Sequence, residues 1–273
     1  MTSEDRDPNP SNGTTDTGEG ARSSTISLGP AGKRQMPIWQ ESILLLCIAL
    51  GLAVLLKAFF IQAFYIPSES MLPGLHVNDR ILVQKVSYWG GGSPQRGDVI
   101  VFSDPDGWLS ESESAGPTSP VAKVLGKVGL YPSGGHLVKR VIGVGGDVIT
   151  CCDKQGRLKV NGVPVDEKAY LAKDTPCAAP LSQQIVGRNQ KCGPRDLKVT
   201  VPKGYLFVMG DNRTDSADSS AHICVPGSTT CPPTQGFVPV DDVVGKVFAL
   251  VWPLSRFDMI SRPDDFKGVP DPR

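Results

Sequence analysis

The 273-residue sequence has no excess of either charge, since 28 Lys and Arg residues balance 28 Asp and Glu residues. A protein held on nucleic acid by bulk charge needs a basic excess, so no nucleic-acid partner is expected. Only three His residues are present, and no Cys-x-x-Cys motif occurs. Both absences argue against a zinc site, because His and closely spaced Cys residues are its usual ligands.

Long apolar runs are also missing, with one exception. Residues 43–56 are uncharged, and after Lys57 the apolar pattern continues to Phe64 and Tyr65. About 22 helical residues rising ~1.5 Å each would span roughly 33 Å, enough to cross a hydrocarbon core of about 30 Å. We therefore expect a single transmembrane anchor helix at 37–63. A cleaved signal peptide and a buried soluble helix are the alternatives.

The two ends of the chain have few large apolar residues. Residues 1–36 are rich in Ser, Thr, Gly, Pro, Asn and Asp, which is typical of a disordered tail. Lys33 and Arg34 flank the start of the apolar run, so the positive-inside rule favours a cytoplasmic N-terminus and places the remainder outside the cytoplasm. Residues 257–273 are expected to form a loose C-terminal tail.

Helical periodicity is nearly missing beyond residue 66, where short apolar runs alternate with Gly and Pro turns. This pattern predicts a mainly β fold. A β domain is expected from residues 64–150 and 203–256, with a long surface loop at 103–136 and a Cys-containing β insertion at 151–202. Strands are expected at 79–85, 98–102, 137–144, 148–150, 158–160, 198–201, 205–209 and 243–251.

Six of the seven cysteines follow the apolar run, and an even number fits disulfides in an oxidising exterior. Cys224 and Cys231 enclose a short loop and form the pair that we expect. The adjacent Cys151–Cys152 residues are expected to bond to other partners, with Cys177 and Cys192 as candidates.

Several residues could carry chemistry, although none is specific alone. Lys139 and Arg140 interrupt an apolar strand, and alternation sends one to each face. A Lys on a solvated face is favoured by this pattern, whereas a buried Lys would have a lowered pKa and could act as a general base. Ser68 and Ser70 lie in a loop between prolines, and such loops are more often turns than nucleophiles. The polar loop at 210–219 is by itself typical of Asx turns.

A Ser-His-Asp triad would need one of the three His residues as its base. His76, His136 and His222 lie in polar or Gly-rich and Pro-rich segments, outside apolar strands. None is expected to be catalytic.

Four motifs follow the apolar run: PSESMLP at 67–73, RGDVIVF at 96–102, KRVIGVGGD at 139–147 and GDNRTDSADS at 210–219. In this order they resemble the bacterial type I signal peptidases (leader peptidases), and the resemblance covers about residues 37–255. Each motif alone is weak, whereas four in order after an apolar run are highly specific.

The resemblance implies a Ser–Lys dyad, with Ser70 as the nucleophile and Lys139 as its general base. The Ser70 backbone N–H and the Ser68 hydroxyl would form the oxyanion hole. Ser216 would orient the Lys139 amine. The other residues implied are Asp211, Asp218 and Arg140 as supporting residues, and Phe64, Ile66, Pro67, Leu75 and Val138 as the lining of shallow substrate pockets.

The function implied is that of a membrane-anchored serine endopeptidase that removes N-terminal signal peptides from exported preproteins after Ala-x-Ala-like sites. It would be a single-pass protein of the bacterial cell membrane, near the secretion translocon, with no metal or organic cofactor. Three alternatives remain open: a Ser–Lys peptidase of the self-cleaving repressor class, a tethered non-enzymatic β domain, and a degenerate relative. The degenerate relative is an alternative because Ser220 stands where the family's final motif usually has Arg. Without that Arg, the salt bridge that would support the loop is missing from the pattern.

Overall fold

The structure is a computed structural model that describes residues 37–105, 107–109, 119, 135–171, 197–224 and 231–272, the side chains at 55–59 excepted. The chain divides into two compact units, Met1–Leu46 and Cys47–Arg273. The expected disordered tail at 1–36, most of the expected loop at 103–136, and both Cys177 and Cys192 lie outside the described residues.

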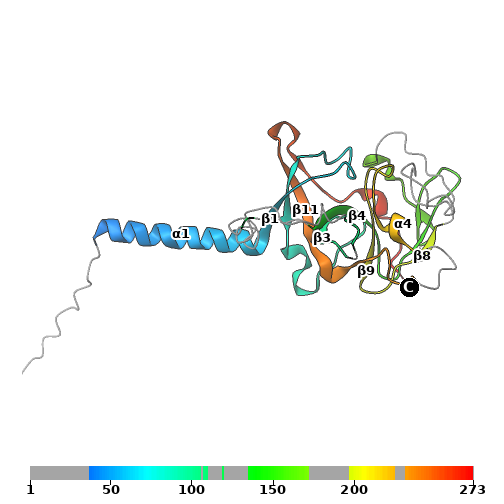
Figure 1. Cartoon of the computed structure of the whole chain (residues 1–273), viewed down its shortest axis with the longest axis horizontal. Coiled ribbons are helices and arrows are strands. Elements are labelled where there is room, and N and C mark those ends of the chain that lie inside the picture. The colour runs from blue at the N-terminus through cyan, green and yellow to red at the C-terminus, as the bar shows by residue number, and fades with distance from the viewer. Residues whose placement is uncertain are drawn as a thin grey trace, which may run out of the picture. The chain divides into compact units, whose positions relative to one another are not determined.

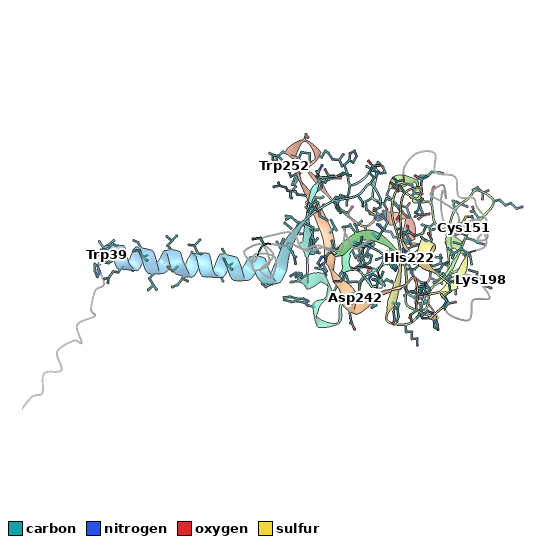
Figure 2. All side chains as sticks on the ribbon, viewed as in Figure 1. Trp39, Cys151, Lys198, His222, Asp242 and Trp252 are labelled. Atoms are coloured by element: carbon teal, nitrogen blue, oxygen red, sulfur yellow. A yellow bond between two sulfur atoms is a disulfide. The ribbon has the colours of Figure 1, made fainter. Side chains whose placement is uncertain are left out.

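The apolar run forms helix α1, which spans Ile38–Phe60. The described side chains of α1 are exposed, as Figure 2 shows for Trp39 near its start. The helix ends earlier than the predicted 37–63, because Ile61–Tyr65 form strand β1 with alternating burial. Across the part of the chain that the structure describes, no helix meets the length and hydropathy of a membrane span. The predicted transmembrane anchor is therefore not confirmed.

The larger sheet has eight strands joined by antiparallel ladders, in the order β1-β2-β11-β3-β4-β9-β10, with β12 paired to β11. Its central strands β3, β4, β9 and β11 are labelled in Figure 1. The bounds are β1 Ile61–Tyr65, β2 Arg80–Gln84, β3 Val99–Ser103, β4 His136–Val144, β9 Tyr205–Met209, β10 Val238–Pro239, β11 Val243–Trp252 and β12 Asp258–Met259.

A smaller four-stranded sheet follows β4 and has the order β7-β6-β5-β8. Its strands are β5 Val148–Thr150, β6 Lys159–Val160, β7 Val163–Pro164 and β8 Lys198–Thr200. The Cys-containing insertion thus supplies three strands, while β5 belongs to the segment before it. An apolar core joins the two sheets, since Ile149 and Leu158 of this part pack in one cluster with Phe207 of β9.

The mainly β fold class is confirmed, and each of the eight predicted strands lies within one residue of an observed strand at both ends. Four strands were not predicted. β1 was hidden inside the apolar run, and β7, β10 and β12 have only two residues each, too few to show an alternating pattern.

The cysteine predictions have mixed outcomes. The expected disulfide between Cys224 and Cys231 is present, with Cα atoms 5.7 Å apart. The expectation for Cys151 and Cys152 is wrong, because the structure joins these neighbours to each other. The expectation rested on their adjacency in the sequence, whereas the structure places their Cα atoms 3.0 Å apart.

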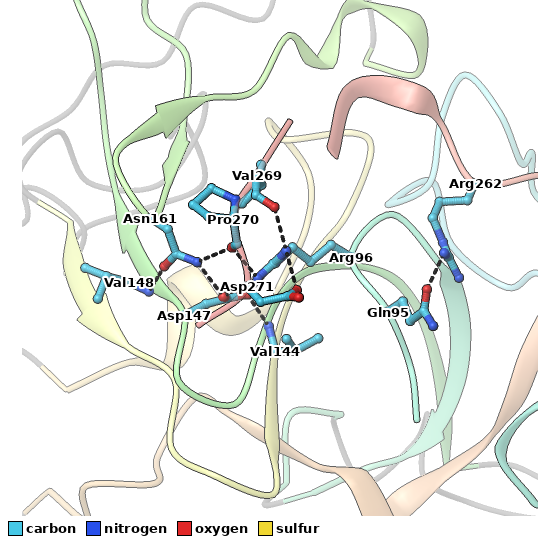
Figure 3. Close-up of polar contacts among 10 residues, drawn as sticks. All are labelled: Gln95, Arg96, Val144, Asp147, Val148, Asn161, Arg262, Val269, Pro270 and Asp271. Carbon is cyan, nitrogen blue, oxygen red and sulfur yellow. Dashed lines mark hydrogen bonds and ion pairs between the residues drawn. The ribbon is translucent and has the colours of Figure 1, made fainter. Parts of the chain in front are cut away.

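The C-terminal segment is not the loose tail that we predicted. Phe266 and Val269 are buried in the core that joins the two sheets. The Arg96 guanidinium donates to the Val269 and Pro270 carbonyls, at 3.3 Å and 3.0 Å, as Figure 3 shows. The same guanidinium forms an ion pair with the buried Asp147 carboxylate. The prediction failed because two apolar side chains, three residues apart in a polar segment, are enough to attach it.

We predict that Phe266→Ala lowers the free energy of unfolding by about 3 kcal/mol, the usual cost of emptying a buried aromatic site. Urea unfolding followed by tryptophan fluorescence measures this change. Leu254→Ala is the matched control, because Leu254 is 72 % exposed and its loss should cost under about 0.5 kcal/mol. Equal midpoints for the two variants would contradict the attachment of the C-terminal segment.

Candidate active site

Ser70 and Lys139, 69 residues apart in sequence, meet in the structure. Ser70 lies in the turn between β1 and β2, and Lys139 lies within β4. The Lys139 Nζ and the Ser70 Oγ are 2.7 Å apart. Ser68 Oγ lies 3.2 Å from Ser70 Oγ. The Ser70 hydroxyl therefore contacts an amine and a second hydroxyl.

Lys139 is buried, with 4 % of its surface exposed. The prediction from the strand pattern alone, that Lys139 lies on a solvated face, is therefore wrong. β4 pairs with β3 on one side and β9 on the other, and both Lys139 and its neighbour Arg140 are covered. In such an interior strand, alternation alone does not tell which charged residue is solvated.

Burial changes the protonation of Lys139. The pKa of its amine falls from 10.5 to about 8, because desolvation penalises the ammonium ion. The carboxylates of Asp218, Asp211 and Asp215 act in the opposite direction and raise this pKa. At pH 8 about half of the Lys139 amines would be neutral, which is the form that can accept a proton.

Arg140 takes a different role from its neighbour on β4. Its Nε and Nη2 donate to the two Asp211 carboxylate oxygens at 2.8 Å and 2.6 Å. Its Nη1 donates to the Gly97 carbonyl at 2.9 Å. This bidentate pair fixes Asp211, the second residue of the last motif, against the central strand.

The last motif also contacts the turn that contains Ser70. The Asn212 backbone N–H donates to the Ser70 carbonyl at 3.0 Å, and the Asn212 side chain donates to the Glu69 carbonyl at 3.1 Å. Gly210 lies so near that an added Cβ would collide with the Ser70 carbonyl and the Ser216 hydroxyl. Gly210 and Asn212 were not predicted as site residues, although both stand in the quoted motif.

Asp218 holds the other end of this loop. Its carboxylate accepts from the Gly210 N–H at 2.9 Å, and from the Ser220 N–H and hydroxyl at 3.0 Å and 2.7 Å. Asp218 also caps the short helix α4, Ser219–His222. Ser220 therefore gives Asp218 neutral donors at the position where the family usually has Arg.

The remaining predicted site residues lie around these groups. Ser216 Oγ is buried and has no hydrogen-bond partner within the described ranges, so its role in orienting the Lys139 amine stays a prediction. Four of the predicted pocket residues share one apolar cluster, and Pro67 is exposed. The four are Phe64, Ile66, Leu75 and Val138, which pack with Met71.

No metal centre is visible at this site. Among the residues with described positions, no group of three His, Cys, Asp or Glu side chains is placed to hold a metal ion. His222, one of the three His residues, contacts the Asp218 carbonyl through Nδ1 at 2.9 Å.

The chain matches a family model described as signal peptidase, peptidase S26, over residues 39–252. It is 40 % identical over 251 residues to a probable signal peptidase I of Mycobacterium leprae, covering 86 % of this chain and 83 % of the relative. It is 41 % identical over 239 residues to signal peptidase I of Mycobacterium tuberculosis, covering 84 % and 78 %.

The protein belongs to the bacterial type I signal peptidases of family S26. It is a serine hydrolase of that family, which removes the repressor-class and non-enzymatic alternatives. A crystal structure of a signal peptidase I from Enterococcus faecalis aligns with 25 % identity and a TM-score of 0.29, covering 56 % of this chain and 95 % of that chain.

We predict that Gly210→Ala lowers kcat at least about a hundredfold, because the new methyl group would displace the Ser70 turn from Lys139. Steady-state cleavage kinetics of the signal peptidase measure the change. Gly268→Ala serves as the control, since nothing lies within 4 Å of the added Cβ there. A Gly210→Ala enzyme as active as Gly268→Ala would show that the close approach is not needed.

Proposed function

We propose that this signal peptidase removes N-terminal signal peptides from exported preproteins, cutting after Ala-x-Ala-like sites with Ser70 and Lys139 as a catalytic dyad. The observation that carries the proposal is the 2.7 Å contact between the Ser70 Oγ and the Lys139 Nζ. A buried amine with a lowered pKa beside a Ser hydroxyl supplies both a nucleophile and its base.

In the first half of the reaction, the Ser70 Oγ attacks the scissile carbonyl carbon while the neutral Lys139 amine accepts the hydroxyl proton. The Ser70 N–H and the Ser68 hydroxyl donate to the resulting oxyanion, each worth about 3 kcal/mol in the transition state. As the C–N bond breaks, the Lys139 ammonium returns its proton to the departing amine. The signal peptide is left as an ester on Ser70.

In the second half, a water molecule attacks that ester and Lys139 accepts a proton from it. The same two donors stabilise the second oxyanion. Collapse releases the signal peptide as a carboxylic acid, which loses its proton to solvent, and the proton on Lys139 returns to Ser70. The dyad is then ready for the next preprotein.

The fold supports binding of an extended substrate beside β1. Among the described residues β1 is the end strand of the larger sheet and pairs with β2 alone, so its other edge could accept a peptide as an added strand. Phe64 and Ile66 lie on this segment, and Leu75 and Val138 pack in the same cluster. Shallow apolar pockets formed here would favour the small side chains of Ala-x-Ala-like sites.

We also propose that the protein acts at the extracytoplasmic surface of the bacterial cell membrane, near the secretion translocon, with its N-terminus in the cytoplasm. The exposed apolar side chains of α1, such as Leu45, Leu46 and Ile48 at 57–59 % exposure, support a location in an apolar medium. Such a location would bring Ser70 to the place where signal peptides emerge.

The deciding experiment is a mass-spectrometric cleavage assay with purified protein in detergent and a preprotein that carries an Ala-x-Ala site. We expect one cut after that site, and none with Ser70→Ala. Circular dichroism should show that the variant is folded. Cleavage that persists in Ser70→Ala would assign the nucleophile elsewhere, and a folded wild-type protein that does not cut would indicate a degenerate relative.

The pH dependence tests the base. Since Lys139 must be neutral to accept the proton, kcat/KM should rise about tenfold per pH unit at low pH and level off near pH 8, where its pKa lies. Lys139→Arg should be inactive at every pH, because a guanidinium stays protonated. Lys168→Arg is the control, since the Lys168 side chain is 86 % exposed. Wild-type activity in Lys139→Arg would overturn the assignment.

A further inference from the structure

A buried ion pair connects the Cys-containing insertion to the last motif. Glu167 begins a 3₁₀ helix, Glu167–Ala169, in the insertion after β7. Its carboxylate accepts from both terminal nitrogens of Arg213, one of them at 3.3 Å. The two side chains are 4 % and 1 % exposed. Such a pair is costly to desolvate, so further contacts are needed to offset its burial.

Arg213 carries this contact into the catalytic loop. Its Nε donates to the Gly210 carbonyl at 2.9 Å. Gly210 packs against the Ser70 carbonyl, and Asn212, the residue before Arg213, donates to that same carbonyl. The orientation of the Arg213 guanidinium therefore affects the position of the Ser70 turn in two ways. One is the hydrogen bond to the Gly210 carbonyl, and the other is the backbone of Asn212, which donates to the Ser70 carbonyl.

Tyr170 connects Glu167 to Arg140, so that the contacts among Glu167, Arg213, the 210–211 backbone, Arg140 and Tyr170 form a closed network. Its hydroxyl donates to Glu167 at 2.8 Å, and the Arg140 guanidinium lies over its aromatic ring at 4.1 Å. Arg140 in turn pairs with Asp211, next to Gly210. Burial and the Glu167 carboxylate raise the pKa of Tyr170 well above its ordinary value, so the hydroxyl stays protonated and keeps donating.

This closed network contains two guanidinium groups and two carboxylates, so its formal charges cancel. Each carboxylate faces one guanidinium: Asp211 faces Arg140, and Glu167 faces Arg213. Removal of Glu167 would leave Arg213 buried without its carboxylate and beside a second buried guanidinium. Arg213 would then turn toward other acceptors or toward water, and the Gly210 carbonyl would lose a fixed donor.

We propose that Glu167, supplied by the insertion, is a positioning residue for the Ser70–Lys139 reaction. It acts by holding the Arg213 guanidinium on the Gly210 carbonyl and does not touch the reacting atoms. This inference rests on the proposed function, since its effect is measured on peptide cleavage.

The first test is Glu167→Gln, compared with wild type in kcat and KM on one preprotein. A misplaced nucleophile turn should lower kcat about tenfold or more while KM stays within about twofold. Asp153→Asn is the matched control, because Asp153 pairs with Arg157 inside the same insertion and should leave both constants unchanged.

A double variant separates positioning from stability. Glu167→Leu alone should lower Tm, because a buried guanidinium loses its partner, whereas Glu167→Leu with Arg213→Met removes both charges and should recover Tm. If Glu167 positions the loop, kcat of the double variant stays low although Tm returns, since the Gly210 carbonyl still lacks its donor. This comparison holds even where the single variant does not fold.

The outcomes are distinct. Unchanged kcat in a folded Glu167→Gln enzyme, or kcat that recovers together with Tm in the double variant, would overturn the positioning role and leave the peptidase function intact. A wild-type protein that cuts no preprotein would overturn the proposed function and this inference together.

Discussion

The amine of Lys139 is the group on which the rest of the site depends. An ammonium ion in the middle of an antiparallel sheet is unstable, and desolvation lowers its pKa to about 8. The nearby carboxylates oppose this change, so they must not act on the amine at full strength. Asp211 is paired with Arg140, and Asp218 is bound by neutral donors. The pKa of the Lys139 amine therefore depends on the arrangement of charges around it as well as on burial.

The two adjacent basic residues on β4, Lys139 and Arg140, make different contacts because their side-chain chemistry differs. Lys139 has a single nitrogen that can lose its proton, and it lies beside the Ser70 hydroxyl. Arg140 keeps its charge and offers a planar set of donors, which fits the two oxygens of Asp211. An exchange of the two residue types would place a permanently charged guanidinium beside the Ser70 hydroxyl and leave Asp211 without a bidentate partner.

The sequence was most informative where a pattern is local. Strands such as β5 and β9 were predicted residue for residue, because alternation and turns are local signals. The end of α1 was misplaced because Ile61, Ala63 and Phe64 continue the apolar run without a turn residue, and the ladder to β2 makes this segment a strand. The burial of Lys139 was not predictable from its own strand, since it depends on β3 and β9, which lie far away in sequence.

Glu167 shows the same limit for a site residue. No motif marks it, and its partner Arg213 lies 46 residues further along the chain. The Arg140–Asp211 pair joins residues 71 apart, yet both of its members stand in recognisable motifs. The Glu167 carboxylate lies in a 3₁₀ helix of the insertion, outside the four motifs, and it reaches the last motif only through Arg213. The Gly210 loop is thus held by Arg140 of β4 through Asp211, and by Glu167 of the insertion through Arg213, so two segments far apart in sequence fix its position beside Ser70.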